Sequence, residues 1–469
     1  MFKHKQSLTD RKIRFYPAAS LLIAAVFSLL VVGRALAALP VTSYDLPISG
    51  SGPNAITAGP DGNLWVTESN ANKIAKISVN GSMTHYSVPT SNAALTSITS
   101  GPDGNLWFTE QFGNKIGKIT TSGAITEYNV TTSTADPWNI VKGSDGNLWF
   151  TEYNVNKIAK ITTSGTITEY PITQGGPFGI APGADGNLWF TDNNDNTVGK
   201  ITTGGTPSYY TLPAGHNFAQ DITAGPDGNL WFDEQTGNSI GRLTTAGVIT
   251  MFSLPTNFQT KGIAAGPDGN VWFASNNSGN PKVGKITPSG VITTYAYPGA
   301  GTADLRALTL GSDNNLWLAN NTPNTIDKLD LQTPPSIANH SISVVTGKSV
   351  TTDVLSGSGD NTNFASLAIT SGPSHGTASV DTTAGTISYT PTSGYIGTDS
   401  LTYTVCSALD TSTCGQATLT FTVTTVASAP NTGFGMFNSN PAKSLGLYGL
   451  GGITLLGLAI VSRKLAKRS

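Results

Sequence analysis

The sequence predicts an all-β protein in which a seven-bladed β-propeller precedes one β-sandwich, and three observations lead to this prediction. A segment of the type Gly-Pro-Asp-Gly-Asn-Leu-Trp-Phe-Thr-Glu recurs seven times, about 40–45 residues apart, and each repeat divides into four short strands. After residue 334 the repeat stops, and Thr- and Ser-rich alternating segments follow. With only 4 Met and few Leu-Glu-Lys runs, helical bundles and coiled coils are excluded as fold classes.

The first element is an export signal over residues 1–37. A basic segment over residues 3–14 precedes an apolar run over residues 17–33, and an Ala-Leu-Ala triplet that ends at Ala37 follows. This order is typical of a secretory signal peptide, and we expect cleavage after Ala37. Because Arg34 lies close to the cleavage site, an uncleaved membrane anchor is the alternative.

Residues 38–333 are expected to form the propeller, with one blade for each repeat. The Asp-Gly pair makes a tight turn between the first two strands, since Gly accepts a positive φ and Asp bonds the nearby backbone. The Leu-Trp-Phe segment is the second strand, and its unbroken apolar run suits a strand packed on both faces. A Lys-Ile-Gly-Lys-Ile-Thr segment supplies the third strand, and a segment such as Ile125–Tyr128 supplies the fourth.

The strand count also predicts how the ring closes. An unpaired strand of the fourth type, at residues 41–47, precedes the first repeat, and the seventh repeat has no fourth strand after it. We therefore predict that residues 41–47 complete the seventh blade and close the ring. Seven of the eight Trp residues occupy one column, where we expect packing between blades. They are Trp65, Trp107, Trp149, Trp189, Trp231, Trp272 and Trp317.

Residues 334–427 have the size of one immunoglobulin-like sandwich, with alternating strands such as Ser400–Val405. Cys406 and Cys414 flank the loop between its last two strands. In an exported chain we expect these two residues to form a disulfide.

A spacer, an apolar run and a basic tail complete the chain. Residues 428–444 are rich in Asn, Ser, Pro and Gly, residues 445–462 form the apolar run, and residues 463–469 carry four basic side chains. We expect the apolar run to span the membrane, with both basic termini in the cytoplasm and everything between them outside. The chain is thus expected to be an extracellular monomer at the cell surface, held to the envelope by its C-terminal anchor.

The exported part is acidic, which restricts its partners. From residue 38 to residue 432 there are about 15 Lys and Arg against 27 Asp and Glu. A nucleic-acid partner is not expected, since phosphate binding needs a basic surface. The sequence also supplies no serine triad, no cysteine nucleophile and no phosphate-binding loop.

Over residues 38–332 the repeats resemble those of the virginiamycin B lyase (streptogramin lyase) family. The resemblance implies a seven-bladed propeller and, in active members, a metal-dependent elimination that linearises a cyclic depsipeptide antibiotic. It also implies a catalytic His just ahead of the first strand of a blade, facing a Glu at the end of the second. We call the first of these positions the His-equivalent column. It reads Asn54, Thr96, Trp138, Phe178, Gln220, Lys261 and Arg306 from the first blade to the seventh. No blade has His there, so the general acid–base step lacks an obvious agent near neutral pH.

Two further resemblances concern the C-terminal part. Residues 335–427, with segments such as Thr352–Leu355 and Gly394–Ser400, look like the bacterial cadherin-like or immunoglobulin-like repeats of surface proteins, which are spacers or adhesive modules. The stretch Ala429, Pro430, Asn431, Thr432, Gly433 is similar to the sortase motif Leu-Pro-x-Thr-Gly. Sortase processing to the cell wall and a plain membrane anchor remain alternatives.

The ends of the second strands supply the candidate metal site, which we call the carboxylate column. It consists of Glu68, Glu110, Glu152, Asp192 and Glu234, followed by Ser275 and Asn320 in the last two blades. Since these strand ends lie on one face of a propeller, we predict an acidic arc at the channel mouth that could bind Mg²⁺ or Ca²⁺. The alternative is that each carboxylate pairs with a Lys or bonds the next blade.

Trp138, Lys261 and Arg306 are the other candidate binding residues at the mouth. Trp138, with Phe178 in the next blade, could stack on a sugar or peptide ring, and packing is the alternative. His216 is the one candidate acid–base His near the mouth.

We interpret the chain as a cell-surface binding or scaffold protein, with no catalytic residue assigned, whose mouth takes a glycan, a peptide or a small cyclic ligand. The alternative is a metal-dependent lyase or lactonase, a carbon–oxygen lyase of the streptogramin B lyase type, that acts on cyclic esters or peptides.

Overall fold

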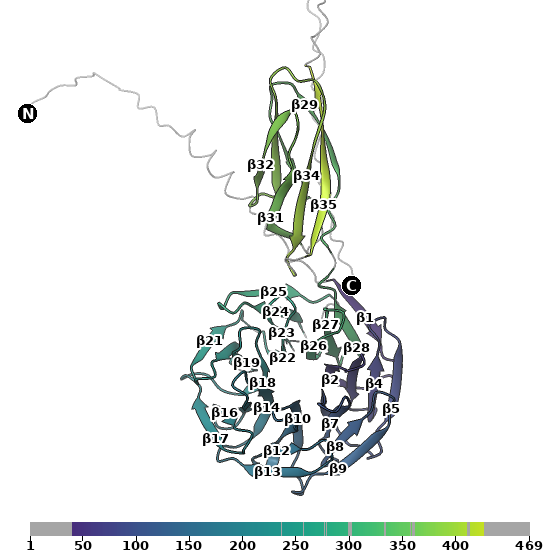
Figure 1. Cartoon of the computed structure of the whole chain (residues 1–469), viewed down its shortest axis with the longest axis vertical. Helices are drawn as coiled ribbons and strands as arrows, with labels where there is room; N and C mark the ends of the chain where they lie inside the picture. The colour runs from purple at the N-terminus through teal and green to yellow at the C-terminus, as the bar shows by residue number, and fades with distance from the viewer. Residues whose placement is uncertain are drawn as a thin grey trace, which may run out of the picture. The chain divides into compact units, whose positions relative to one another are not determined.

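A computed structural model of the chain describes residues 40–425, apart from short gaps at 236, 257, 276, 278, 299–302, 333, 357, 359–361 and 410–412. The described part of residues 40–332 forms seven four-stranded antiparallel sheets that are arranged as propeller blades (Figure 1). In each blade the strand that precedes the Asp-Gly turn lies nearest the axis, as β2, β10 and β14 do in Figure 1. The repeat therefore forms the four strands that the sequence predicts.

The strands of the seven blades run as follows, from the axis outward. The first three blades are β2 (Pro53–Ala58), β3 (Leu64–Glu68), β4 (Lys73–Ile77) and β5 (Met83–Ser87); β6 (Leu95–Ser100), β7 (Leu106–Glu110), β8 (Lys115–Ile119) and β9 (Ile125–Asn129); and β10 (Pro137–Lys142), β11 (Leu148–Glu152), β12 (Lys157–Ile161) and β13 (Ile167–Pro171). The next two are β14 (Pro177–Pro182), β15 (Leu188–Asp192), β16 (Thr197–Ile201) and β17 (Pro207–Thr211); and β18 (Ala219–Ala224), β19 (Leu230–Glu234), β20 (Ser239–Leu243) and β21 (Ile249–Ser253). The last two are β22 (Thr260–Ala265), β23 (Val271–Ser275), β24 (Lys282–Ile286) and β25 (Ile292–Ala296); and β26 (Leu305–Leu310), β27 (Leu316–Asn320), β28 (Thr325–Leu329) and β1 (Val41–Asp45).

The ring closes as predicted, through the N-terminal strand. β1 pairs antiparallel with β28, in a register that places Val41 opposite Leu329 and Asp45 opposite Thr325. The Ser51 hydroxyl also donates to the Asn324 side-chain oxygen at 3.0 Å, which ties the chain after β1 to the seventh blade. The first and last strands of the propeller are thus held in one sheet.

The repeat Trp residues pack between blades, which confirms the prediction for this column. Trp65 is fully buried and belongs to the same apolar cluster as Leu95 and Phe108 of the next blade. Its indole Nε1 donates to the Asp61 carboxylate at 3.1 Å, so the Asp of the Asp-Gly turn satisfies the one polar group of the ring. One repeat motif therefore builds both the turn and the contact between blades.

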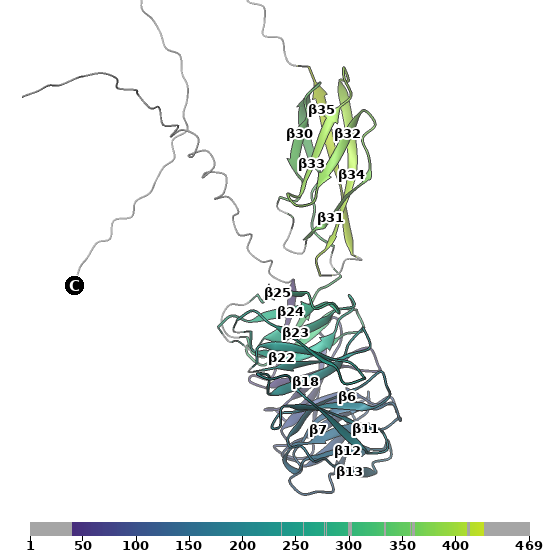
Figure 2. The ribbon, with the colours of Figure 1, turned by 90° about the vertical axis from the view of Figure 1, so that its left-hand side faces the viewer.

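The C-terminal part forms a sandwich of two sheets, both visible in Figure 2. One sheet contains β29 (His340–Val345), β35 (Cys414–Thr424), β34 (Gly397–Ser407) and β31 (Thr362–Ser371), and the other contains β30 (Val350–Asp353), β33 (Thr386–Pro391) and β32 (Gly376–Asp381). Tyr389, Tyr403 and Phe421 are fully buried in its core. Cys406 and Cys414 lie opposite each other on β34 and β35 and form the predicted disulfide.

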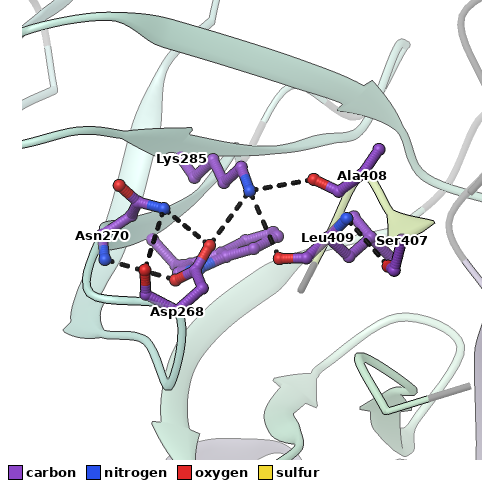
Figure 3. Close-up of polar contacts among 7 residues, drawn as sticks. Asp268, Asn270, Lys285, Ser407, Ala408 and Leu409 are labelled. Atoms are coloured by element: carbon purple, nitrogen blue, oxygen red, sulfur yellow. Dashed lines mark hydrogen bonds and ion pairs between the residues drawn. The ribbon is translucent and has the colours of Figure 1, made fainter. Parts of the chain in front are cut away.

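The loop that follows β34 contacts the propeller at Lys285 of β24 (Figure 3). The Lys285 amine donates to the Asp268 carboxylate at 3.0 Å and to the backbone oxygens of Ala408 and Leu409 at 3.1 and 3.3 Å. The Leu409 side chain is buried in an apolar cluster with Trp272 and Leu305. Lys285 and Leu409 therefore join the two domains by one polar and one apolar contact.

The predicted signal peptide with its cleavage after Ala37, the sorting motif at residues 429–433 and the apolar run at residues 445–462 lie outside the described residues. Within the part that the structure describes, no helix has the length and apolar character needed to cross a bilayer.

Candidate functional site

The axis of the propeller contains a cavity of about 100 Å³, which we call the mouth cavity. All seven residues of the His-equivalent column line it, and Asp221 is among the other lining residues. Each member of the column is the second residue of its innermost strand, next to a shift in the pairing with the second strand. Because such a bulge redirects side chains, it explains why this column reaches the channel.

A second hollow of about 170 Å³ adjoins the mouth cavity in the channel. Ser97, Asn139 and Asp221 line it together with one aliphatic side chain from each blade. The aliphatic side chains are Ile56, Ile98, Ile140, Ile180, Ile222, Ile263 and Leu308. Because Ser97, Asn139 and Asp221 line both hollows, the channel keeps polar groups beyond the His-equivalent column.

Three aromatic rings form one side of the site. The Trp138 and Phe178 ring centroids lie 4.8 Å apart, so these two side chains contact each other across neighbouring blades. Tyr153, from the short 3-10 helix η1 (Tyr153–Val155) after β11, lies 6.4 Å from Trp138 and 6.3 Å from Phe178. Sequence reasoning missed Tyr153, which directly follows Glu152. The signal was an aromatic residue at a position where other repeats have a polar one, such as Ser69 or Gln111.

Arg306 is held in place at the opposite side of the ring. Its Nε donates to an Asp304 carboxylate oxygen at 2.9 Å, and its Nη2 forms an ion pair with the same oxygen at 2.8 Å. Its Nη1 donates to the Asn54 side-chain oxygen at 3.3 Å. Asn321 also donates to the Asp304 carboxylate, at 2.9 Å. Burial alone would raise the pKa of Asp304, but the bonds from Arg306 and Asn321 lower it. Asp304, which the sequence did not single out, thus positions the guanidinium group.

Lys261 lies beside Arg306 and, among the described residues, makes no hydrogen bond and no ion pair within 4.0 Å. Burial lowers the pKa of its amine, and the charge of Arg306 adds to this effect. The carboxylates of Asp304, Asp221 and Asp233 act in the opposite direction. The amine therefore faces the cavity with its three donors unused.

Blade five departs from the repeat just behind Lys261. In earlier blades a Thr of the second strand donates to the next blade, as Thr109 does to the Trp138 backbone oxygen at 3.0 Å. The equivalent Asp233 is fully buried and accepts a bond from the Asp221 amide at 2.8 Å. Burial and the Asp221 charge raise the pKa of Asp233 well above its usual range. The sequence signal for this change is Phe-Asp-Glu in place of Phe-Thr-Glu.

The carboxylate column does not form the predicted arc at the mouth. None of Glu68, Glu110, Glu152, Asp192, Glu234, Ser275 and Asn320 lines the mouth cavity, and all seven are buried inside separate blades. The prediction placed the strand ends on the correct face. It failed because the innermost strand separates these side chains from the channel.

The surroundings of the acidic side chains confirm this placement. The charged neighbours of Glu110 are Lys115 and Glu127, on the two outer strands of the same blade. Burial, followed by repulsion from Glu127, raises the pKa of Glu110 to about 7. The Nδ1 atom of His216 lies 2.8 Å from the Glu234 carboxylate, which assigns this His to a hydrogen bond with the carboxylate column and not to the cavity wall.

A divalent ion of the kind that the family resemblance implies does not fit these residues. In the part of the chain that the structure describes, no group of three or more His, Cys, Asp or Glu side chains is arranged to hold a metal. The mouth cavity presents two cationic side chains, and Asp304 is already bonded to one of them. We therefore derive no chemical step through Mg²⁺ or Ca²⁺.

Comparison with known proteins shows that the similarity covers whole domains and not only the repeat motif. The sequence profile of the Virginiamycin B lyase family matches residues 28–175 and 173–352, and that of the Bacterial Ig domain matches residues 332–424. Virginiamycin B lyase from Staphylococcus aureus is 36% identical over 62% of this chain and 98% of its own, with a TM-score of 0.59.

Two further solved structures show the same level of similarity. A streptogramin B lyase is 36% identical over 63% of this chain and 98% of its own, with a TM-score of 0.60. A catalytically inactive His-to-Ala variant of the Staphylococcus aureus enzyme with quinupristin is 36% identical over 62% and 98%, with a TM-score of 0.59. Since the family profile covers more than half of the sequence, the chain belongs to the virginiamycin B lyase family and carries a bacterial immunoglobulin-like domain after its propeller.

Proposed function

We propose that this protein is a cell-surface binding protein whose ligand enters the mouth cavity of the propeller. The observation that carries the proposal is the His-equivalent column itself. The blades repeat the Trp, the Asp of the tight turn and a basic residue on the third strand, yet this one column holds seven different residue types, and all of them line one cavity. Positions that only support packing repeat from blade to blade, whereas a binding surface needs a different group on each side.

Two further features support binding rather than turnover. The cavity has aromatic rings on one side and Lys261 and Arg306 on another, which are groups that hold a ligand by stacking and by charge. None of its described lining residues is a His, so the wall lacks the imidazole that the family resemblance implies. The immunoglobulin-like domain would act as a spacer between the propeller and the envelope anchor.

The experiment that tests this proposal is a glycan and peptide array probed with the full chain and with two variants. Trp138→Ala removes an aromatic ring from the cavity. Phe112→Ala is the matched control, because Phe112 is 76% exposed and does not line the cavity. We expect array signals that Trp138→Ala abolishes and Phe112→Ala retains. Signals that survive Trp138→Ala would exclude the mouth cavity as the binding face.

A metal-dependent lyase or lactonase that acts on cyclic esters or peptides is the second candidate. The 36% identity over nearly the whole length of two lyases favours it, although a shared fold does not transfer activity. Incubation of the full chain with a streptogramin B antibiotic and Mg²⁺, followed by mass spectrometry, separates the two candidates. If the full chain opens the antibiotic ring and the Lys261→Gln variant does not, the protein is a lyase and the proposed binding function is wrong.

A further inference from the structure

We infer that the mouth cavity takes a ring that carries a single carboxylate, with the carboxylate on Lys261 and Arg306 and the ring against Trp138 and Phe178. This inference rests on the proposed function, because it requires the mouth cavity to be the binding face. It adds the chemical class of the ligand.

Lys261 lacks the carboxylate partner that several other half-buried lysines have. Lys115 and Lys157 donate to Glu127 and Glu169 at 2.7 and 2.6 Å. Lys285 donates to Asp268 at 3.0 Å. Lys261 is half-buried on the cavity wall and, within the described residues, makes no such bond. Since burying an unpaired cation is unfavourable, an anion that enters the cavity would supply the missing partner.

The charges around Lys261 and Arg306 indicate how much charge a ligand must bring. Asp304 already balances Arg306, with two contacts at 2.9 and 2.8 Å. Burial raises the pKa of Asp221 and that of Asp233, although the charge of Lys261 acts in the opposite direction. Within the described residues, no carboxylate lies within 4.0 Å of the Lys261 amine. Lys261 is therefore the cation of this pair without an ion-pair partner, and a ligand with one negative charge would supply it.

The shape of the Lys261 and Arg306 pair suits a planar anionic group. Asp304 and Asn54 hold the guanidinium of Arg306 in a fixed orientation, so its remaining edge can meet a planar acceptor. A carboxylate is planar and can accept from an Arg and from the neighbouring Lys amine at the same time.

The aromatic side of the mouth cavity lies across from the Lys261 and Arg306 pair. Trp138 and Phe178 come from blades three and four, whereas Lys261 and Arg306 come from blades six and seven, so the two pairs face each other across the ring of seven blades. Sugar and aromatic rings both stack on such side chains. With a volume of about 100 Å³, the cavity suits one ring with its acid group and not a long chain.

The experiment is an isothermal titration of the full chain with two acids and their neutral analogues. Methyl glucuronide represents a hexuronic acid at the end of a glycan, and benzoate represents an aromatic acid. Methyl glucoside and benzamide are the neutral analogues. We expect at least one acid to bind at least tenfold more tightly than its neutral analogue. Preference for one acid over the other identifies the source of the ring.

The matched variants are Lys261→Gln and Lys142→Gln, because Lys142 is an exposed residue at the other end of the same type of strand. We expect Lys261→Gln to weaken acid binding at least tenfold and Lys142→Gln to leave it unchanged, with both variants folded by circular dichroism. Absence of acid binding, equal binding of acids and neutral analogues, or unchanged binding in Lys261→Gln would each overturn the inference. If the array instead yields neutral ligands whose binding depends on Trp138, the carboxylate inference is wrong and the proposed binding function still stands.

Discussion

At the scale of single residues, the carboxylate column shows how differently two acidic side chains of one blade can behave. Glu152 is fully buried, and neither of its carboxylate oxygens has a hydrogen-bond partner among the described residues. Burial, followed by repulsion from Glu169, raises the pKa of Glu152 to about 8. Glu169 accepts bonds from Lys157 at 2.6 Å and from the Thr132 amide at 2.9 Å. These bonds outweigh its burial and lower its pKa.

The first prediction is that Glu152→Gln stabilises the propeller at pH 8.5 but not at pH 5. In the unfolded chain a Glu ionises above about pH 4.3, whereas the folded chain keeps Glu152 protonated up to about pH 8. The native state therefore loses stability as the pH rises through this window, and the neutral amide removes that loss. We expect a gain on the order of 1–3 kcal/mol at pH 8.5, measured by urea unfolding.

Glu169→Gln is the control for this prediction, because Glu169 has partners and a lowered pKa. It should destabilise the propeller at pH 8.5 instead of stabilising it. An equal change in the free energy of unfolding at pH 5 and pH 8.5 for Glu152→Gln would show that folding does not raise the pKa of this carboxyl.

At the scale of elements, β1 and the hairpin of β34 and β35 perform the same task in two domains, since each holds together parts that would otherwise separate. β1 covers the outer edge of β28 in the seventh blade, where unpaired backbone groups would otherwise be exposed. Tyr44 of β1 also stacks on Trp317 with 5.5 Å between the ring centroids. The disulfide between Cys406 and Cys414 closes the end of the hairpin.

The second prediction concerns ring closure. Deletion of residues 41–47 should lower the melting temperature of the propeller by several degrees and promote association, because the edge of β28 becomes free to pair with another chain. Addition of a synthetic peptide that spans residues 38–49 should restore the melting temperature in calorimetry. A scrambled peptide serves as the control. A deletion that melts like the parent chain would show that closure by β1 contributes nothing to stability.

The third prediction concerns the disulfide. Replacement of Cys406 and Cys414 by Ser should destabilise the sandwich by about 2–3 kcal/mol, since the cross-link restricts the unfolded loop. The measurement is urea unfolding followed by the near-ultraviolet signal of the sandwich tyrosines. Reducing agent should reproduce the shift in the parent chain and have no effect on the double variant. If the parent chain unfolds identically with and without reductant, the bond does not stabilise the domain.

At the scale of the whole molecule, the propeller keeps the acidic side chains of the carboxylate column apart from the charged side chains that line the mouth cavity. The carboxylate column is enclosed within the blades, whereas the cavity receives the cations of blades six and seven. This arrangement follows from the order of the strands. The innermost strand of every blade lies between the channel and the strand that carries the acidic residue.

The fourth prediction follows from this separation. Because no described cluster of acidic or imidazole side chains is arranged to hold a metal, we expect the propeller to melt at the same temperature in 5 mM Mg²⁺, 5 mM Ca²⁺ and EDTA. Differential scanning calorimetry of the full chain at constant ionic strength measures this. A bound ion at a hundredfold excess over its dissociation constant would add about 2.7 kcal/mol, which is readily detected as a higher melting temperature.

A good part of the candidate site was predictable from the sequence, but not all of it. Trp138, Lys261 and Arg306 were found because they break a column of the repeat, and the structure brings all three to one cavity. Tyr153 and Asp304 were not found, because they act through loops and neighbouring strands whose positions depend on the assembled ring. The disulfide was predictable since its two residues are neighbours across one hairpin.

The sequence by itself determined the number of blades, the strands within each blade, the closure by the N-terminal strand and the following sandwich. These features depend on local turn chemistry and on periodic apolar positions, and both can be recognised within a single repeat of the sequence. Only the tertiary structure decided which of two neighbouring polar columns faces the channel. That choice depends on the bulge in each innermost strand and on the packing of seven blades around one axis. A repeat pattern specifies the height of a residue along its strand, whereas the direction of its side chain is set by the neighbours that surround it.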